Sequence, residues 1–133
     1  TVQSAGNDGS GCSSIGAPAA IYDESFSVGA TDMTDDIAWF SSRGPVTIDG
    51  SNRTKPNVSA PGVGIRSSTL DGWYHGGWDG TSMAGPHVAG LVALIVSRTP
   101  GLAGQVGLIE DIIEQTAVPR TTTDGCGGDP PGA

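Results

Sequence analysis

The stretch "DGTSMAGPHVAGLVALIVSR", from Asp79 to Arg98, decides the fold that we expect for this chain. Its apolar residues recur at the spacing of one helix face, at Val88, Leu91, Val92 and Ile95. Alanines cover the other faces, and an apolar pattern on all sides is typical of a buried helix. We therefore predict a buried helix from Ser82 to about Arg98, with a small hydroxyl residue at its N-terminus.

Shorter elements surround this helix. The segment "GQVGLIEDIIEQTA", residues 104–117, predicts a second helix with one apolar and one acidic face. Apolar runs predict short strands at residues 26–30, 37–41, 57–60 and 64–69. The glycine-rich stretch "LDGWYHGGWDG", residues 70–80, is expected to be a loop. Alternating strands and helices favour an α/β layer arrangement.

Length and charge limit the classes of function. A chain of 133 residues is typical of one domain, residues 1–133, with a modest core. Its formal net charge of -8 argues against nucleic acid as a partner, because phosphate binding needs clustered Lys and Arg. The longest apolar run, Val88 to Val96, is too short to cross a bilayer, so we expect no membrane span.

Ser82 has two interpretations. Ser and Thr are favoured helix caps, so Thr81 or Ser82 could simply satisfy an orphan N–H group. However, Gly80 and Gly85 keep the backbone narrow on both sides and would let a substrate come close. A helix N-terminus favours negative charge, and the Ser82 N–H could point at a developing oxyanion. The second interpretation is acyl transfer at Ser82.

The motif "GTSMAGPHVAG" closely resembles the nucleophile signature of subtilisin-like serine proteases. The segments "SAGNDG", "FSVGATD", "FSSRGP", "SAPGVGIRSS" and "YHGGWDGTSMA" follow in family order, so the resemblance covers residues 3–118. "SSRGPV" and "GCGG" resemble the bacillopeptidase F-like branch. The resemblance implies a partial three-layer fold with a mostly parallel sheet and a buried helix that begins at the nucleophile.

The resemblance also implies site roles for particular residues. Ser82 would be the nucleophile of a serine endopeptidase, and the side-chain amide of Asn7 would donate to the oxyanion. Ser4, Ala5 and Gly6 would supply backbone to one wall of the substrate-binding pocket. Without the resemblance, Asn7 in Asn-Asp-Gly is an ordinary turn residue.

The base that a catalytic serine needs is not evident in this chain. In the family, the catalytic Asp and His precede the oxyanion asparagine, so we expect the chain to be the C-terminal part of a catalytic domain that lacks both. We expect His87 to make a structural hydrogen bond and His75 to lie in a loop at the cleft rim. The acids of "TDMTDD", Asp32, Asp35 and Asp36, are expected in a solvated turn.

These expectations define the partners. The resemblance implies a secreted enzyme that acts on peptide or protein substrates, while the isolated chain is expected to be inactive. Bare apolar surfaces predict that it forms oligomers or associates with the missing upstream part of the domain. One alternative is a protease-like module that binds peptides without cutting them. A purely structural glycine-rich domain is disfavoured by Ser82 and Asn7.

Cys12 and Cys126 lie in glycine-rich loops near opposite ends, and their spacing matches no zinc site. They could form one disulfide, bond separately to other chain, or remain free thiols. We expect no required cofactor and no metal among the site residues. The family often binds calcium, which loop carbonyls near Ala19 to Tyr22 could hold, but this sequence itself does not support a calcium site.

Overall fold

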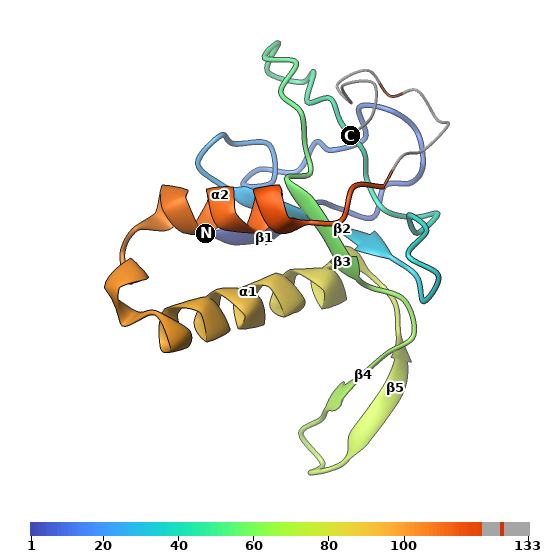
Figure 1. Cartoon of the computed structure of the whole chain (residues 1–133). Coiled ribbons are helices and arrows are strands. Elements are labelled where there is room, and N and C mark those ends of the chain that lie inside the picture. Colours follow the sequence, from blue (N-terminus) through green and yellow to red (C-terminus); the bar gives the residue numbers. More distant parts are fainter. Residues whose placement is uncertain (121–125, 127–133) are drawn as a thin grey trace.

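Three short strands form the sheet at the centre of the computed structural model, which describes residues 1–120 and 126. The strands β1 (Val2–Ser4), β2 (Phe26–Thr31) and β3 (Val58–Pro61) are parallel and lie in the order β1-β2-β3 (Figure 1). The central strand β2 is buried along almost its whole length, because both of its faces are covered. The predicted strands at residues 26–30 and 57–60 are thus confirmed, whereas β1 was not predicted.

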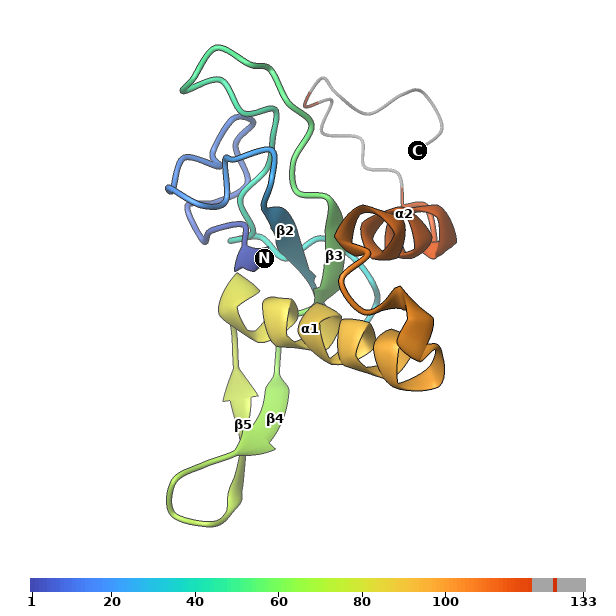
Figure 2. The ribbon, with the colours of Figure 1, turned by 90° about the vertical axis from the view of Figure 1, so that its left-hand side faces the viewer.

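Two helices pack against this sheet. Helix α1 (Thr81–Arg98) contacts all three strands, and a short 3₁₀ helix, η1 (Pro100–Leu102), leads to α2 (Val106–Thr116) (Figure 2). One apolar cluster joins these elements, with Phe26 and Val28 from β2, Val88 from α1 and Ile109 from α2. Both predicted helices and the α/β class are confirmed.

Helix α1 is buried along one side only, and its fully buried residues all lie in its first half. Its buried residues are Thr81, Ala84, Gly85 and Val88. Farther along, Leu91 is 42% exposed and Leu94 is 69% exposed. The prediction of a helix buried all round is therefore wrong, because the sheet and α2 cover only one side of the helix.

A hairpin projects from the body just before α1. Strand β4 (Ile65–Ser68) pairs antiparallel with β5 (Tyr74–Trp78), and both ribbon views show it extending away from the sheet (Figures 1 and 2). The strand predicted at residues 64–69 is confirmed, but the loop predicted at residues 70–80 is wrong for Tyr74–Trp78, which form β5. The Thr69 N–H donates to the Trp73 carbonyl and closes the turn, so the following residues return as a strand.

The strand predicted at residues 37–41 is also wrong. Only Ile37 forms an isolated bridge, to Thr31. The Ala38 N–H donates to the Ala30 carbonyl, and the Ser41 N–H donates back to the Ala38 carbonyl. This closed turn exposes Trp39 and buries Phe40, so the apolar run marks a turn against the C-terminal end of the central strand β2.

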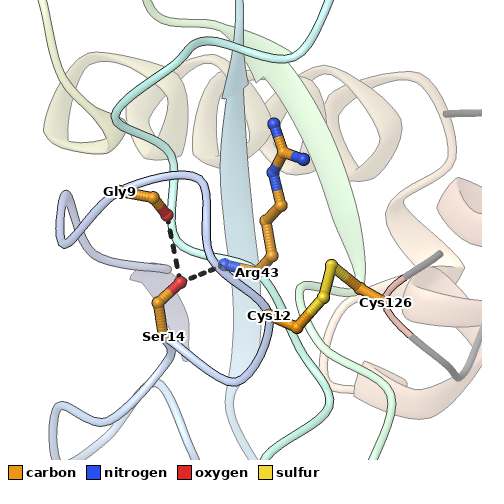
Figure 3. The surroundings of a disulfide bond; sticks show 5 residues. All are labelled: Gly9, Cys12, Ser14, Arg43 and Cys126. Carbon is orange, nitrogen blue, oxygen red and sulfur yellow. Dashed lines mark hydrogen bonds between the residues drawn. A yellow bond between two sulfur atoms is a disulfide. The ribbon is translucent and has the colours of Figure 1, made fainter. Parts of the chain in front are cut away.

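A disulfide bond joins Cys12 to Cys126 across 114 residues of sequence (Figure 3). This result selects the mutual pairing among the three alternatives for the cysteines. Apart from Cys126, the segment "TTTDGCGGDPPGA" lies outside the described residues. In the part of the chain that is described, no helix has the length and apolar character needed to cross a membrane.

Candidate active site at the start of helix α1

Ser82 is the second residue of α1 and is exposed. The residue before the helix is Gly80, and no side chain caps the helix N-terminus. The capping interpretation is therefore wrong for both hydroxyl residues. Among the described residues, none hydrogen-bonds the Ser82 hydroxyl, whose position leaves it open to a substrate.

Gly80 shapes the approach to Ser82. Its φ of 150° lies in a region that favours glycine. A Cβ atom there would lie 3.4 Å from Nδ2 of Asn7 and 3.6 Å from the Met83 sulfur. These are ordinary contact distances, so it is the backbone conformation that favours glycine here, and the Asn7 amide lies beside the backbone just ahead of Ser82.

Asn7 is oriented by the first residue of the helix. Its Oδ1 accepts hydrogen bonds from the Thr81 N–H (3.0 Å) and the Thr81 hydroxyl (2.9 Å). Because a backbone N–H can only donate, the oxygen of the amide must face Thr81. The NH₂ group is then left beside Gly80, where it can donate to a bound group.

Thr81 is the residue of this site whose role the sequence did not reveal. It is 1% exposed, and its hydroxyl also accepts the Gly6 N–H at 3.3 Å. The only signal in the sequence is a hydroxyl residue next to Ser82, for which helix capping was one open interpretation. In the structure, Thr81 joins the loop that carries Asn7 to the helix that carries Ser82.

The predicted pocket wall, residues Ser4, Ala5 and Gly6, lies at the end of β1 and beside α1. The Ala5 N–H donates to the Val28 carbonyl, which continues the sheet by one residue. A Cβ atom at Gly85 would lie 3.5 Å from Oγ of Ser4, so this part of α1 lies beside the Ser4 side chain. Substrate binding by these three residues stays a prediction.

His87 faces its own helix. Its Nδ1 lies 2.8 Å from the Met83 carbonyl, one turn earlier, and donates a hydrogen bond to it in the tautomer that carries the proton on Nδ1. This contact agrees with the structural hydrogen bond that we expected. Five helical positions separate His87 from Ser82, so the two side chains project in different directions.

His75 lies in strand β5, within the projecting hairpin, and not in a loop as expected. Its Nε2 is 2.9 Å from the carboxylate of Asp71. Hydrogen bonds from the Thr69 hydroxyl and then from His75 lower the pKa of Asp71 below its ordinary value. This pair belongs to the hairpin turn and is not assembled with Ser82.

The predicted calcium position near residues 19–22 contains a positive side chain. The Arg53 guanidinium donates to the Ile21 carbonyl and pairs with the carboxylates of Asp49 (3.0 Å) and Asp23 (3.9 Å). A calcium ion at the same carbonyl would be repelled by this charge. The residues at Ile21 therefore do not fit a bound cation.

The acidic turn predicted at residues 32–36 is observed. Oδ1 of Asp32 accepts hydrogen bonds from the Thr34 hydroxyl (2.7 Å), the Thr34 N–H (2.8 Å) and the Asp36 N–H (3.1 Å). These hydrogen bonds, led by the one from the Thr34 hydroxyl, lower the pKa of Asp32. Its carboxylate therefore closes an exposed turn and is not brought to Ser82.

Comparison with known proteins agrees with this geometry. A sequence profile described as the subtilase family matches residues 1–129. Bacillopeptidase F from Bacillus subtilis (strain 168) is 49% identical over 111 residues, which cover 84% of this chain and 7% of that protein. Subtilisin amylosacchariticus from Bacillus subtilis subsp. amylosacchariticus is 43% identical over 115 residues, which cover 85% of this chain and 27% of that protein.

Solved structures give the same result. A cold-adapted subtilisin-like serine proteinase superposes with a TM-score of 0.71 and 29% identity, over 92% of this chain and 40% of that one. The S41 psychrophilic protease gives a TM-score of 0.67 and 37% identity, over 86% of this chain and 38% of that one. The chain thus spans well under half of the proteases that it matches. It belongs to the subtilase family of serine proteases.

Proposed function

We propose that this chain supplies the nucleophile and the oxyanion hole of a serine endopeptidase. The observation that carries the proposal is the arrangement around Thr81, which fixes the Asn7 amide beside the helix residue Ser82. A nucleophile and an oriented donor on adjoining backbone segments suit acyl transfer. Membership of the subtilase family supports the same reaction.

In the proposed reaction, Oγ of Ser82 attacks the carbonyl carbon of a peptide bond while its proton passes to a base. The negative charge moves to the carbonyl oxygen, where the Ser82 N–H and the Asn7 NH₂ group would stabilise it. The Ser82 N–H is available because the first N–H groups of a helix have no partner within it. The backbone of Ser4, Ala5 and Gly6 would hold the substrate strand alongside.

We place the base and its orienting acid outside these 133 residues. His87 is engaged by its own helix and His75 by Asp71, so neither is arranged to accept the Ser82 proton. The isolated chain is then inactive until the remainder of the domain binds. The exposed side of α1, including Leu94, is a suitable surface for that remainder.

The disulfide bond supports a secreted protein, since such bonds persist in oxidising compartments. Secretion also fits the peptide or protein substrates that the proposed reaction requires.

The proposal is tested with a fusion. Residues 1–133 are joined behind the part of the bacillopeptidase F catalytic domain that precedes the matched region; by family order it carries the Asp and the His. We expect the fusion to cleave fluorescein-labelled casein, and the chain alone and the Ser82→Ala fusion to be inactive. Cleavage by the chain alone would contradict the proposed inactivity. A folded fusion that binds casein without cleaving it would favour the peptide-binding alternative.

A further inference from the structure

The motif "FSSRGP" contains two buried serines, Ser41 and Ser42, that the proposed reaction does not use. Both are 0% exposed although their side chains are polar. A buried hydroxyl without a partner is costly, so the contacts of these two serines indicate what they do.

Ser42 holds the loop on both sides of Asn7. Its N–H donates to the Gly6 carbonyl (2.9 Å), and its Oγ accepts the Asp8 N–H (3.0 Å). A Cβ atom at Gly6 would lie 2.9 Å from this Oγ, so Ser42 packs directly beneath the loop. A single residue, Ser42, thus fixes Gly6 through its backbone N–H and Asp8 through its side chain.

Ser41 attaches the same segment to the sheet. Its Oγ accepts the Ala30 N–H of β2 at 3.0 Å. A Cβ atom at Gly29 would lie 3.3 Å from this Oγ, so a glycine on the central strand makes room for the serine. A continuous path therefore runs from β2 through Ser41 and Ser42 to the Asn7 loop.

Further contacts continue the same attachment. The Gly9 N–H donates to the Phe40 carbonyl at 3.0 Å. Ser14 donates its hydroxyl to the Gly9 carbonyl and accepts the Arg43 N–H, beside the disulfide of Cys12 (Figure 3). In this set, only Ser42 contacts both neighbours of Asn7.

We infer that Ser42 is a positioning residue, which fixes the backbone of the Asn7 loop so that the Asn7 amide meets the oxyanion. Thr81 orients the side chain of Asn7, and Ser42 fixes its backbone. Ser42 does not touch the substrate, so it acts only through Asn7. The expected effect of Ser42 on the reaction rate rests on the proposed function. The expected effect of Ser42 on the position of Asn7 rests on the loop geometry alone.

The first test uses the ¹⁵N-labelled 133-residue chain and the variant Ser42→Ala. We expect amide exchange at Asp8 to accelerate about tenfold, because its N–H loses the Ser42 acceptor. The order parameter of the Asn7 side-chain amide should fall as well. The matched control is Ser27→Ala, another serine that is 0% exposed, whose hydroxyl donates to Asn57, the residue just before β3, and not to the Asn7 loop. It should leave Asp8 and Asn7 unchanged.

The second test measures rate in the fusion. We expect Ser42→Ala to lower kcat about tenfold while KM stays within about twofold, because a misplaced donor weakens the transition state more than the ground state. In an Asn7→Ala background, Ser42→Ala should lower kcat no further. Ser27→Ala should leave kcat unchanged.

Three results would overturn the inference. The first is a folded Ser42→Ala chain in which the Asp8 exchange rate and the Asn7 side-chain amide are unchanged. The second is a loss of kcat on Ser42→Ala that is equally large in the Asn7→Ala background. The third is an equal loss of kcat in the control Ser27→Ala. A fusion without protease activity would refute the proposed function, while the Asp8 and Asn7 measurements would still decide the positioning role. If Ser42→Ala does not fold, Ser42→Cys replaces it, because a thiol fills the space but is a poor acceptor.

Discussion

Two regions at the N-terminal end of helix α1 are built in opposite ways. At the first, which we call the Asn7–Ser82 junction (residues 4–9 and 80–85), Thr81 bonds Asn7 across 74 residues of sequence. At the second, the β4–β5 hairpin, the side-chain contacts of Asp71 with Thr69, Trp73 and His75 span two to four residues and are exposed. The junction therefore depends on the whole fold, whereas the hairpin turn depends on its own sequence.

This difference has a functional meaning. A catalytic donor must be held in place before the substrate arrives, and contacts from distant, buried segments hold it more firmly than a local turn does. The hairpin has no such requirement, and Trp73 remains 72% exposed at its turn. Substitutions at the junction should change the reaction, and substitutions in the hairpin should change only the hairpin.

The largest effect is expected for Ser82→Ala in the fusion. Turnover should fall by roughly 10⁶, because no acyl-enzyme can form. Initial rates with a fluorogenic peptide measure the loss, and circular dichroism controls for the fold. Residual activity within tenfold of the unmodified fusion would mean that another residue is the nucleophile.

Asn7→Ala should have the next largest effect. Loss of one oxyanion donor lowers kcat by about 10²–10³, with little change in KM. Asn52→Ala is the control, because Asn52 is an exposed asparagine of a different loop. Equal rates for both variants would remove Asn7 from the mechanism.

Thr81→Val should have a smaller effect that includes stability. The valine keeps the volume but cannot donate to Asn7 or accept the Gly6 N–H. We expect kcat to fall about tenfold and the free energy of unfolding to fall by about 1–2 kcal/mol. Urea titration and initial rates measure the two quantities. Thr69→Val, in the hairpin, should leave kcat unchanged; a comparable loss there would contradict the contrast between the two regions.

The smallest effect concerns the hairpin at low pH. The pKa of Asp71 is lowered in the folded chain, so its carboxylate stabilises the turn above the ordinary pKa of 3.8. As the pH falls through the lowered value, protonation removes this contribution and the turn should loosen. The amide shift of Trp73, whose N–H donates to Asp71, reports the change. Asp71→Asn should abolish this transition, while the amide of Asn7 should not respond in either chain.

Local pattern predicted the framework of the fold. The recurrence at Val88, Leu91 and Val92 located α1, and the run from Phe26 to Ala30 located β2. The prediction for the hairpin was wrong because its glycines favoured a loop, whereas pairing with Ile65–Ser68 makes Tyr74–Trp78 a strand. The prediction for residues 37–41 was wrong because an apolar run does not distinguish a strand from a turn packed on the end of a strand, here β2.

The site was predicted only as far as its motifs allowed. The resemblance pointed to Ser82 and Asn7, but it gave no reason to link Thr81 with Asn7 or Ser42 with Gly6 and Asp8. These links join segments more than 30 residues apart, and only the folded backbone brings them together. For the same reason, the sequence could not show that Arg53 lies at the Ile21 carbonyl.

The most direct test of the central claim is intact-mass labelling with a fluorophosphonate, applied to the chain alone and to the fusion. We predict no adduct on the chain alone and one adduct, located at Ser82 by peptide mapping, on the fusion. An adduct on the chain alone would contradict the account, because a group within these 133 residues, with His75 the first to examine, would then activate Ser82. A folded fusion without an adduct would also contradict it, in favour of a module that binds peptides without cutting them.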